Sequence, residues 1–222
     1  MTTPGPPISP PPVERPRLRG WSHLVAFAVS IVAGPLLVAG ADPRSRWLVG
    51  VYVAGATAVF GVSALYHRVA WSVRARAIMR RLDHATIFVL IAASYTAVGG
   101  LALPHLLDGV LLWLIWVGAL VGIALQLVVP HWRRLAAASY LALGWVVIPG
   151  LPALHAALAG GQVALLLGGG LFYTAGAIIY ATKRPGLAPR VFGYHELFHA
   201  LVIAAVGCHL VLVLTLAGTG SA

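Results

Sequence analysis

Two histidines stand one helical turn apart near the end of the chain, in the segment His195-Glu196-Leu197-Phe198-His199. Residues at positions i and i+4 of a helix lie above one another on the same face, so both imidazoles can bind one ion. This H-E-x-x-H spacing can supply two nitrogen ligands to a tetrahedral zinc ion. The segment is therefore a candidate for half of a metal site.

Further candidate residues lie in two earlier segments. Ser63 and His67 are also four residues apart, and Asp83 precedes another apolar run. With His67 as a third imidazole, a zinc ion would keep its fourth position for water, as in catalytic sites. Asp83 could then act on that water, although Asp83 could instead cap a helix and Ser63 could bond to its own helix. If one of these three histidines is not a ligand, His23 is the next candidate.

The composition excludes a water-soluble globular protein. Of the 222 residues, 60% are hydrophobic and 9% are charged, and the mean hydropathy is +0.91. A soluble domain is about half apolar and about a quarter charged. The net charge of +10 could indicate nucleic-acid binding, but the basic residues lie between apolar runs, so we expect no nucleic-acid partner.

The apolar runs predict an all-α membrane protein with seven transmembrane helices. A helix of about 20 residues crosses the hydrocarbon core of a bilayer, whereas barrel strands are shorter and alternate apolar with polar residues. Residues 1–20, rich in proline and arginine, are expected to form a disordered tail, and residues 21–222 the transmembrane domain. The expected spans are residues 21–41, 47–66, 83–101, 109–129, 135–154, 161–181 and 194–217.

The distribution of positive charge predicts the orientation. All Lys and Arg residues except Arg44 and Arg46 fall in the tail or in connectors on the same side of the membrane as the tail. Cytoplasmic connectors carry the excess of positive charge, so we expect a cell-membrane protein with a cytoplasmic N-terminus and an external C-terminus. This topology places His67, Asp83 and the two histidines of the last span in one layer near the cytoplasmic face.

These motifs resemble the hemolysin III family of bacterial membrane proteins, which is related to progestin and adiponectin receptors and to alkaline ceramidases. The similar segments are Arg17–His23, Ser63–His67, Leu82–Phe88 and His195–His199. The resemblance implies a seven-helix fold and zinc held by His67, His195 and His199. It also implies that Asp83 acts through the bound water, with Ser63 close by.

Two classes of function follow from these residues. The first is a zinc-dependent hydrolase of lipid amides or esters that serves membrane-lipid homeostasis, in which Asp83 activates water and Ser63 helps to stabilise the oxyanion. The second is a non-enzymatic protein, either a channel or cytolysin with haemolytic activity or a lipid-sensing receptor, in which zinc has a structural role. In both classes the expected partners are membrane lipids. An intramembrane metalloprotease is disfavoured, because no downstream acidic motif for a third ligand is apparent.

Overall fold

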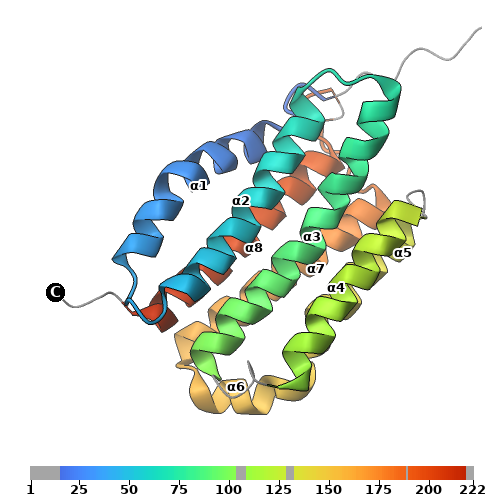
Figure 1. Ribbon diagram of the computed structural model, residues 1–222. Helices are drawn as coiled ribbons and strands as arrows, with labels where there is room; N and C mark the ends of the chain where they lie inside the picture. Colours follow the sequence, from blue (N-terminus) through green and yellow to red (C-terminus); the bar gives the residue numbers. More distant parts are fainter. Residues whose placement is uncertain (1–15, 104–108, 129–132, 189, 219–222) are drawn as a thin grey trace, which may run out of the picture.

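The computed structural model describes residues 16–103, 109–128, 133–188 and 190–218. Within these ranges, seven stretches of helix are long and apolar enough to cross a membrane, which confirms the predicted fold class (Figure 1). The helices are α1 (Trp21–Gly40), α2 (Arg46–Arg68), α3 (Val73–Ala102), α4 (Val110–Val128), α5 (Arg133–Gly144), α6 (Leu151–Ala157), α7 (Gly160–Thr182) and α8 (Tyr194–Ala217).

The third span begins earlier than the sequence analysis predicted. We expected it to start at Asp83, but α3 begins at Val73, where the side chain of Ser72 accepts a hydrogen bond from the backbone of Ala75. The basic residues between Val73 and Asp83 favour helix formation, so they extend the helix beyond the apolar run. Asp83 therefore lies inside α3 and does not cap it.

The fifth span is broken near its middle. The helix α5 ends at Gly144, a 3₁₀ segment with Pro149 follows over residues Trp145–Gly150, and α6 continues from Leu151. Prolines remove backbone donors and disrupt the regular helix here. The hydroxyl of Tyr95 on α3 donates to the Gly144 carbonyl at 2.8 Å and accepts from the Val147 amide at 2.9 Å. These bonds satisfy the interrupted backbone within the bundle.

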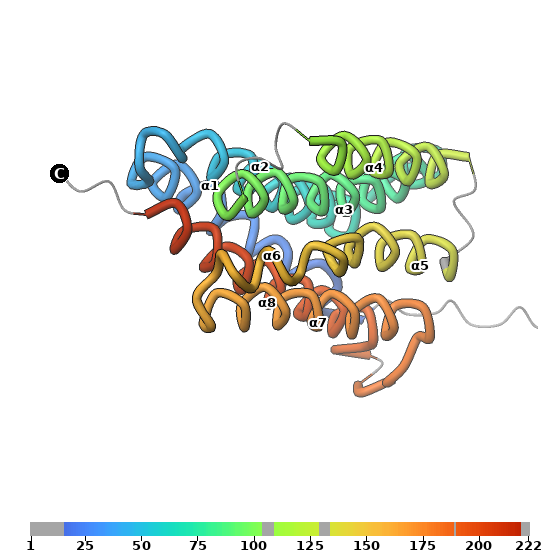
Figure 2. The backbone as a smooth tube through the Cα atoms, turned by 90° about the horizontal axis from the view of Figure 1, so that it is seen from below, coloured from blue at the N-terminus to red at the C-terminus, as the bar shows by residue number. Residues whose placement is uncertain are grey.

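The helices α2 and α8 form the centre of the bundle. In Figure 1, α2, α3 and α4 lie side by side in front of α7 and α8, and Figure 2 shows these layers from below. The fully buried Tyr52 of α2 donates a hydrogen bond to the Val206 carbonyl of α8 at 2.8 Å. A Cβ atom at Gly55 would lie 2.8 Å from the Cβ of Ala93, so the missing side chain lets α2 approach α3 closely.

Part of the predicted disordered tail has a defined structure. Residues 1–15 lie outside the described ranges, but the backbone amides of Arg17 and Leu18 donate to the carbonyls of Arg190 and Val191. The segment continues through Gly20 into α1, and the Arg68 guanidinium lies 4.4 Å from the centre of the Trp21 ring. The chain preceding α1 is thereby attached to the ends of α2 and α8.

Candidate metal centre

Three buried imidazoles meet where the end of α2 lies against the beginning of α8. The Nε2 atoms of His67 and His195 are 3.0 Å apart, and His199 completes a group whose nearest ligand atoms all lie within 4.8 Å of one another. The three residues are at most 9% exposed. The spacing that the sequence suggested therefore brings two histidines of α8 together with one histidine of α2.

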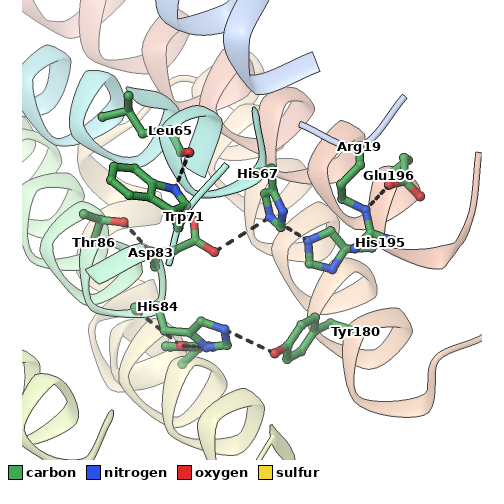
Figure 3. Close-up of polar contacts among 11 residues, drawn as sticks. Arg19, Leu65, His67, Trp71, Asp83, His84, Thr86, Tyr180, His195 and Glu196 are labelled. Atoms are coloured by element: carbon green, nitrogen blue, oxygen red, sulfur yellow. Dashed lines mark hydrogen bonds and ion pairs between the residues drawn. The ribbon is translucent and has the colours of Figure 1, made fainter. Parts of the chain in front are cut away.

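The residues Asp83 and Ser63 lie beside this group. The Oδ2 atom of Asp83 is 4.0 Å from Nε2 of His67, and Figure 3 shows His67 between Asp83 and His195. Ser63, one turn before His67 on α2, lies close enough to Asp83 for its hydroxyl to interact with the carboxylate. The cap suggested for Asp83 and the bond of Ser63 to its own helix are thus replaced by a contact between α2 and α3.

The geometry of the three histidines fits a transition-metal ion. Two nitrogens bound tetrahedrally to zinc, each about 2.0–2.1 Å from the ion, lie about 3.3–3.4 Å apart. The separations in the cluster, from 3.0 Å up to 4.8 Å, reach this value with small side-chain adjustments. The buried Nδ1 of His199 has no hydrogen-bond partner within the described part of the chain. Three imidazoles leave one tetrahedral position for another group.

The reserve candidate His23 also reaches the cluster, but with a different geometry. Its ring stacks on the ring of His199, with centroids 3.9 Å apart and planes inclined by 9°. Parallel rings cannot both point a nitrogen at one ion between them, since rings bound to one metal diverge from it. His23 is 2% exposed and packs as a support for the ring of His199.

The residue Glu196 does not face the cluster despite its place between the two histidines. One carboxylate oxygen accepts a hydrogen bond from the backbone amide of Gly193 at 2.8 Å, and the other forms an ion pair with Arg19. Figure 3 shows Glu196 turned toward Arg19. Glu196 therefore closes the first turn of α8 and attaches the segment before α1 to it. Its partner Arg19 lies 177 residues away in the chain, and no local signal in the sequence identifies this pair.

The residue His84, which follows Asp83, belongs to a second polar group next to the cluster. Its Nδ1 lies 3.3 Å from the hydroxyl of Tyr140, and its Nε2 lies 3.3 Å from the hydroxyl of Tyr180. Through these two contacts the group connects α3 with α5 and α7, and Figure 3 shows His84 directed toward Tyr180.

Replacing Glu196 with alanine is expected to destabilise the fold without removing a bound metal. The variant loses both the cap on α8 and the ion pair, so the free energy of unfolding should fall by about 1–3 kcal/mol. Thermal unfolding in detergent and metal content would be measured for Glu196→Ala and for Arg19→Met, which removes only the ion pair. A stable Glu196→Ala protein that has lost its metal would contradict this assignment.

Comparison with known proteins gives the family. The sequence profile described as "Haemolysin-III related" matches residues 12–210. The chain is 29% identical to the "Hemolysin-3 homolog" of Bacillus subtilis (strain 168), over 82% of this chain and 84% of that protein. It is 34% identical to "Hemolysin-3" of Bacillus cereus, over 46% and 48% of the two chains.

A plant protein is similar over a comparable length. The chain is 32% identical to the "Heptahelical transmembrane protein ADIPOR2" of Oryza sativa subsp. japonica, over 76% of this chain and 81% of that protein. The family profile covers all the residues of the candidate metal centre, from Ser63 to His199. The chain is a multi-pass membrane protein that belongs to the hemolysin III family, which is related to the adiponectin receptors.

Proposed function

We propose that this protein is a zinc-dependent hydrolase of lipid amides or esters that acts within the membrane. The observation that carries the proposal is the cluster of three buried histidines, which leaves one tetrahedral position for another group and has Asp83 and Ser63 beside it. Imidazoles suit zinc, and three protein ligands are typical of catalytic zinc sites.

The apolar interior supports a lipid substrate. A cavity of about 120 Å³, which we call the central cavity, lies between α3, α5, α7 and α8. Its lining includes Phe198, whose ring is 5.9 Å from that of the candidate ligand His195. Hydrocarbon side chains such as Leu90, Ile91 and Val202 form most of its wall. An apolar cavity of this size suits a short segment of an acyl chain whose polar end lies at the histidines.

In this mechanism His67, His195 and His199 would hold the ion, which would supply a Lewis acid and lower the pKa of water to about 7. The Asp83 carboxylate, 4.0 Å from Nε2 of His67, takes a proton from water at Oδ2 and returns it to the leaving amine or alcohol. The Ser63 hydroxyl, which lies near Asp83, would donate to the carboxylate and orient it. The low exposure of these side chains limits entry of bulk water.

A structural role of the metal is the second candidate. An ion held by His67, His195 and His199 would join α2 to α8, and helix association in lipid lacks the hydrophobic driving force that acts in water. A channel, a cytolysin and a lipid-sensing receptor would all use the ion in this way. Loss of the metal would then weaken the bundle, whereas replacement of Asp83 alone would leave the protein's activity intact.

The metal itself is the first test. Detergent-purified protein should contain about one zinc per chain by mass spectrometry, and the double variant His195→Ala, His199→Ala should contain none, because two of three ligands are removed. His155→Ala is the matched control, since this exposed histidine of α6 lies outside the cluster. Wild-type protein without metal after chelator-free purification would remove the hydrolase mechanism.

The replacement Asp83→Asn separates the enzyme from the structural alternative. It keeps the shape of the side chain but removes the proton acceptor, so release of fatty acid from amide and ester lipids in mixed micelles should fall about 10²–10⁴-fold. Zinc content should remain at the wild-type level. Asp42→Asn, in the connector before α2, is the control. An unchanged rate in Asp83→Asn would contradict the role given to this carboxylate.

We also propose that the protein lies in the cell membrane with its N-terminus in the cytoplasm. In a Cys208→Ser background, a cysteine at Arg44 should react with a membrane-impermeant maleimide in intact cells, because this connector has little positive charge. A cysteine at Gly186, where an added Cβ meets no atom within 4 Å, should react only after permeabilisation. The reverse labelling pattern would invert the topology and place the metal centre at the outer face.

A further inference from the structure

The helices α1 and α2 form a groove at the edge of the bundle, where α1 lies beside α2 (Figure 1). The groove has a volume of about 860 Å³, and its lining residues run from Phe27 to Ala39 on α1 and from Gly50 to Leu65 on α2. We call it the α1–α2 groove. Its volume falls within the range of about 300–1,000 Å³ that is typical of ligand pockets. It shares no lining residue with the central cavity.

The wall of the α1–α2 groove is almost entirely hydrocarbon. Ser30 and Thr57 are the lining residues with polar side chains, and the hydroxyl of Ser30 donates to the carbonyl of Phe27 on its own helix. Between Gly50 and Leu65 the axis of α2 rises by about 22 Å, which exceeds the depth of about 15 Å that each leaflet contributes to the hydrocarbon core. The groove is therefore long enough and apolar enough for one acyl chain.

A cation lies at one end of the α1–α2 groove. Arg68 ends α2 three residues after Leu65, and it follows Gly61 and Ala54 at intervals of seven residues. Residues at these intervals share one face of a helix, so Arg68 continues the wall that Ala54 and Gly61 line. The guanidinium of Arg68 lies 4.4 Å from the centre of the Trp21 ring at the beginning of α1. The charge is therefore held where the two helices that form the groove meet.

The charge of Arg68 is not balanced by a neighbouring acid. Within the described ranges of the chain, the ion pairs join Arg19 to Glu196 and His67 to Asp83, so Arg68 has no carboxylate partner there. The residue is exposed. An exposed arginine at the end of an apolar groove attracts an anion that is attached to a hydrocarbon chain.

An anionic phospholipid matches both parts of this site. Its acyl chain suits the apolar wall, and its phosphate is an anion that an arginine can bind through two parallel hydrogen bonds. A neutral acylglycerol would fill the groove but leave Arg68 without an anion. A second copy of this chain fits less well, because Arg17 precedes Trp21 and Arg74 follows Arg68 in the sequence, so two copies would bring like charges together.

We propose that the α1–α2 groove binds an anionic phospholipid, with one acyl chain along the groove and the phosphate at Arg68. The site is separate from the central cavity and does not depend on the proposed hydrolysis. A Cβ atom at Gly20 would lie 3.4 Å from the Cδ of Arg68 and 2.5 Å from the Cβ of His67. The bound headgroup therefore stabilises the junction of α1 with α2, next to a candidate metal ligand.

Equilibrium binding of a defined lipid tests the site. The full-length protein in a neutral maltoside detergent is incubated with radiolabelled palmitoyl-oleoyl phosphatidylglycerol, which is then displaced by the unlabelled lipid or by the diacylglycerol with the same chains. Hydrogen bonds between charged groups predict that phosphatidylglycerol binds about tenfold more tightly than the diacylglycerol. Glycerol phosphate, which has no chains, should not displace the labelled lipid.

Variants of Arg68 separate this site from a general attraction to basic residues. Arg68→Gln should reduce the preference for phosphatidylglycerol to about twofold or less, because the cation is lost. Arg74→Gln removes an equal charge from an exposed residue outside the groove, so this matched control should keep the preference. Arg68→Lys keeps the charge but loses the paired hydrogen bonds, so its preference should be intermediate, and it serves as the test if Arg68→Gln does not fold.

The variant Ala54→Phe tests the position of the acyl chain. Ala54 is exposed and lines the groove, so a phenyl ring there would occupy the space of the chain. Binding of both lipids should weaken about tenfold or more. Ala124→Phe, at an exposed position of α4 outside the groove, is the control and should bind both lipids as the wild type does.

The possible outcomes decide the proposal in either direction. Equal binding of the two lipids by the wild type, no binding, a full preference in a folded Arg68 variant, or unchanged binding in Ala54→Phe would overturn it. Displacement by glycerol phosphate would assign Arg68 to free phosphate esters, and a wild-type dimer that binds no lipid and becomes a monomer in Ala54→Phe would assign the groove to a second copy. A preference in the wild type and Arg74→Gln that is lost in Arg68→Gln, with weaker binding in Ala54→Phe, supports the proposal, whether or not any lipid is hydrolysed.

Discussion

The structure depends on one constraint: a polar group within the hydrocarbon layer must find its partner inside the chain. The break in the fifth span shows this, because the hydroxyl of Tyr95 takes over bonds that the interrupted backbone lacks. The acid of the H-E-x-x-H segment shows it again, since Glu196 is paired with Gly193 and Arg19. The bonds of Tyr95 and the ion pair of Glu196 with Arg19 join segments that are distant in sequence. Polar side chains that are paired in this way are not available to bind a ligand.

Several buried polar atoms have no partner within the described part of the chain, and three of them belong to the stacked rings of His23 and His199. His199 belongs to the histidine cluster, and the residues His209 and Tyr173 line the central cavity and also contain unpaired polar atoms. A buried polar atom without a partner carries a cost, which a bound ligand removes only when the ligand reaches that atom. The histidine cluster lies on α2 and α8, and His209 and Tyr173 lie on α8 and α7, so α8 contributes to both places.

Much of the fold and the cluster could be predicted from the sequence. The apolar runs are regular enough to predict five spans to within two residues, and the i, i+4 spacing on α8 is a local property of a helix. The alternating direction of the spans then predicted that His67 would lie at the same depth as His195. These predictions succeed because the length of an apolar run, the charge of a connector and the helical period are each properties of a single segment of the sequence.

The remaining features depend on contacts between segments. The start of α3 was missed because charged residues that extend a helix beyond the apolar run resemble a connector. The role of Glu196 depends on Arg19 at the other end of the chain, and the stacking of His23 on His199 depends on how α1 crosses α8. The edge-to-face contact of the rings of His209 and Tyr173 was also not predicted, since each residue alone resembles an ordinary core side chain.

Gly20 limits how the start of the chain can vary. Its φ angle of 79° belongs to the left-handed region, and a Cβ atom there would lie 2.5 Å from the Cβ of His67. A side chain at residue 20 would therefore displace a candidate metal ligand as well as strain the backbone. The glycine is therefore as constrained as the histidine on which it packs.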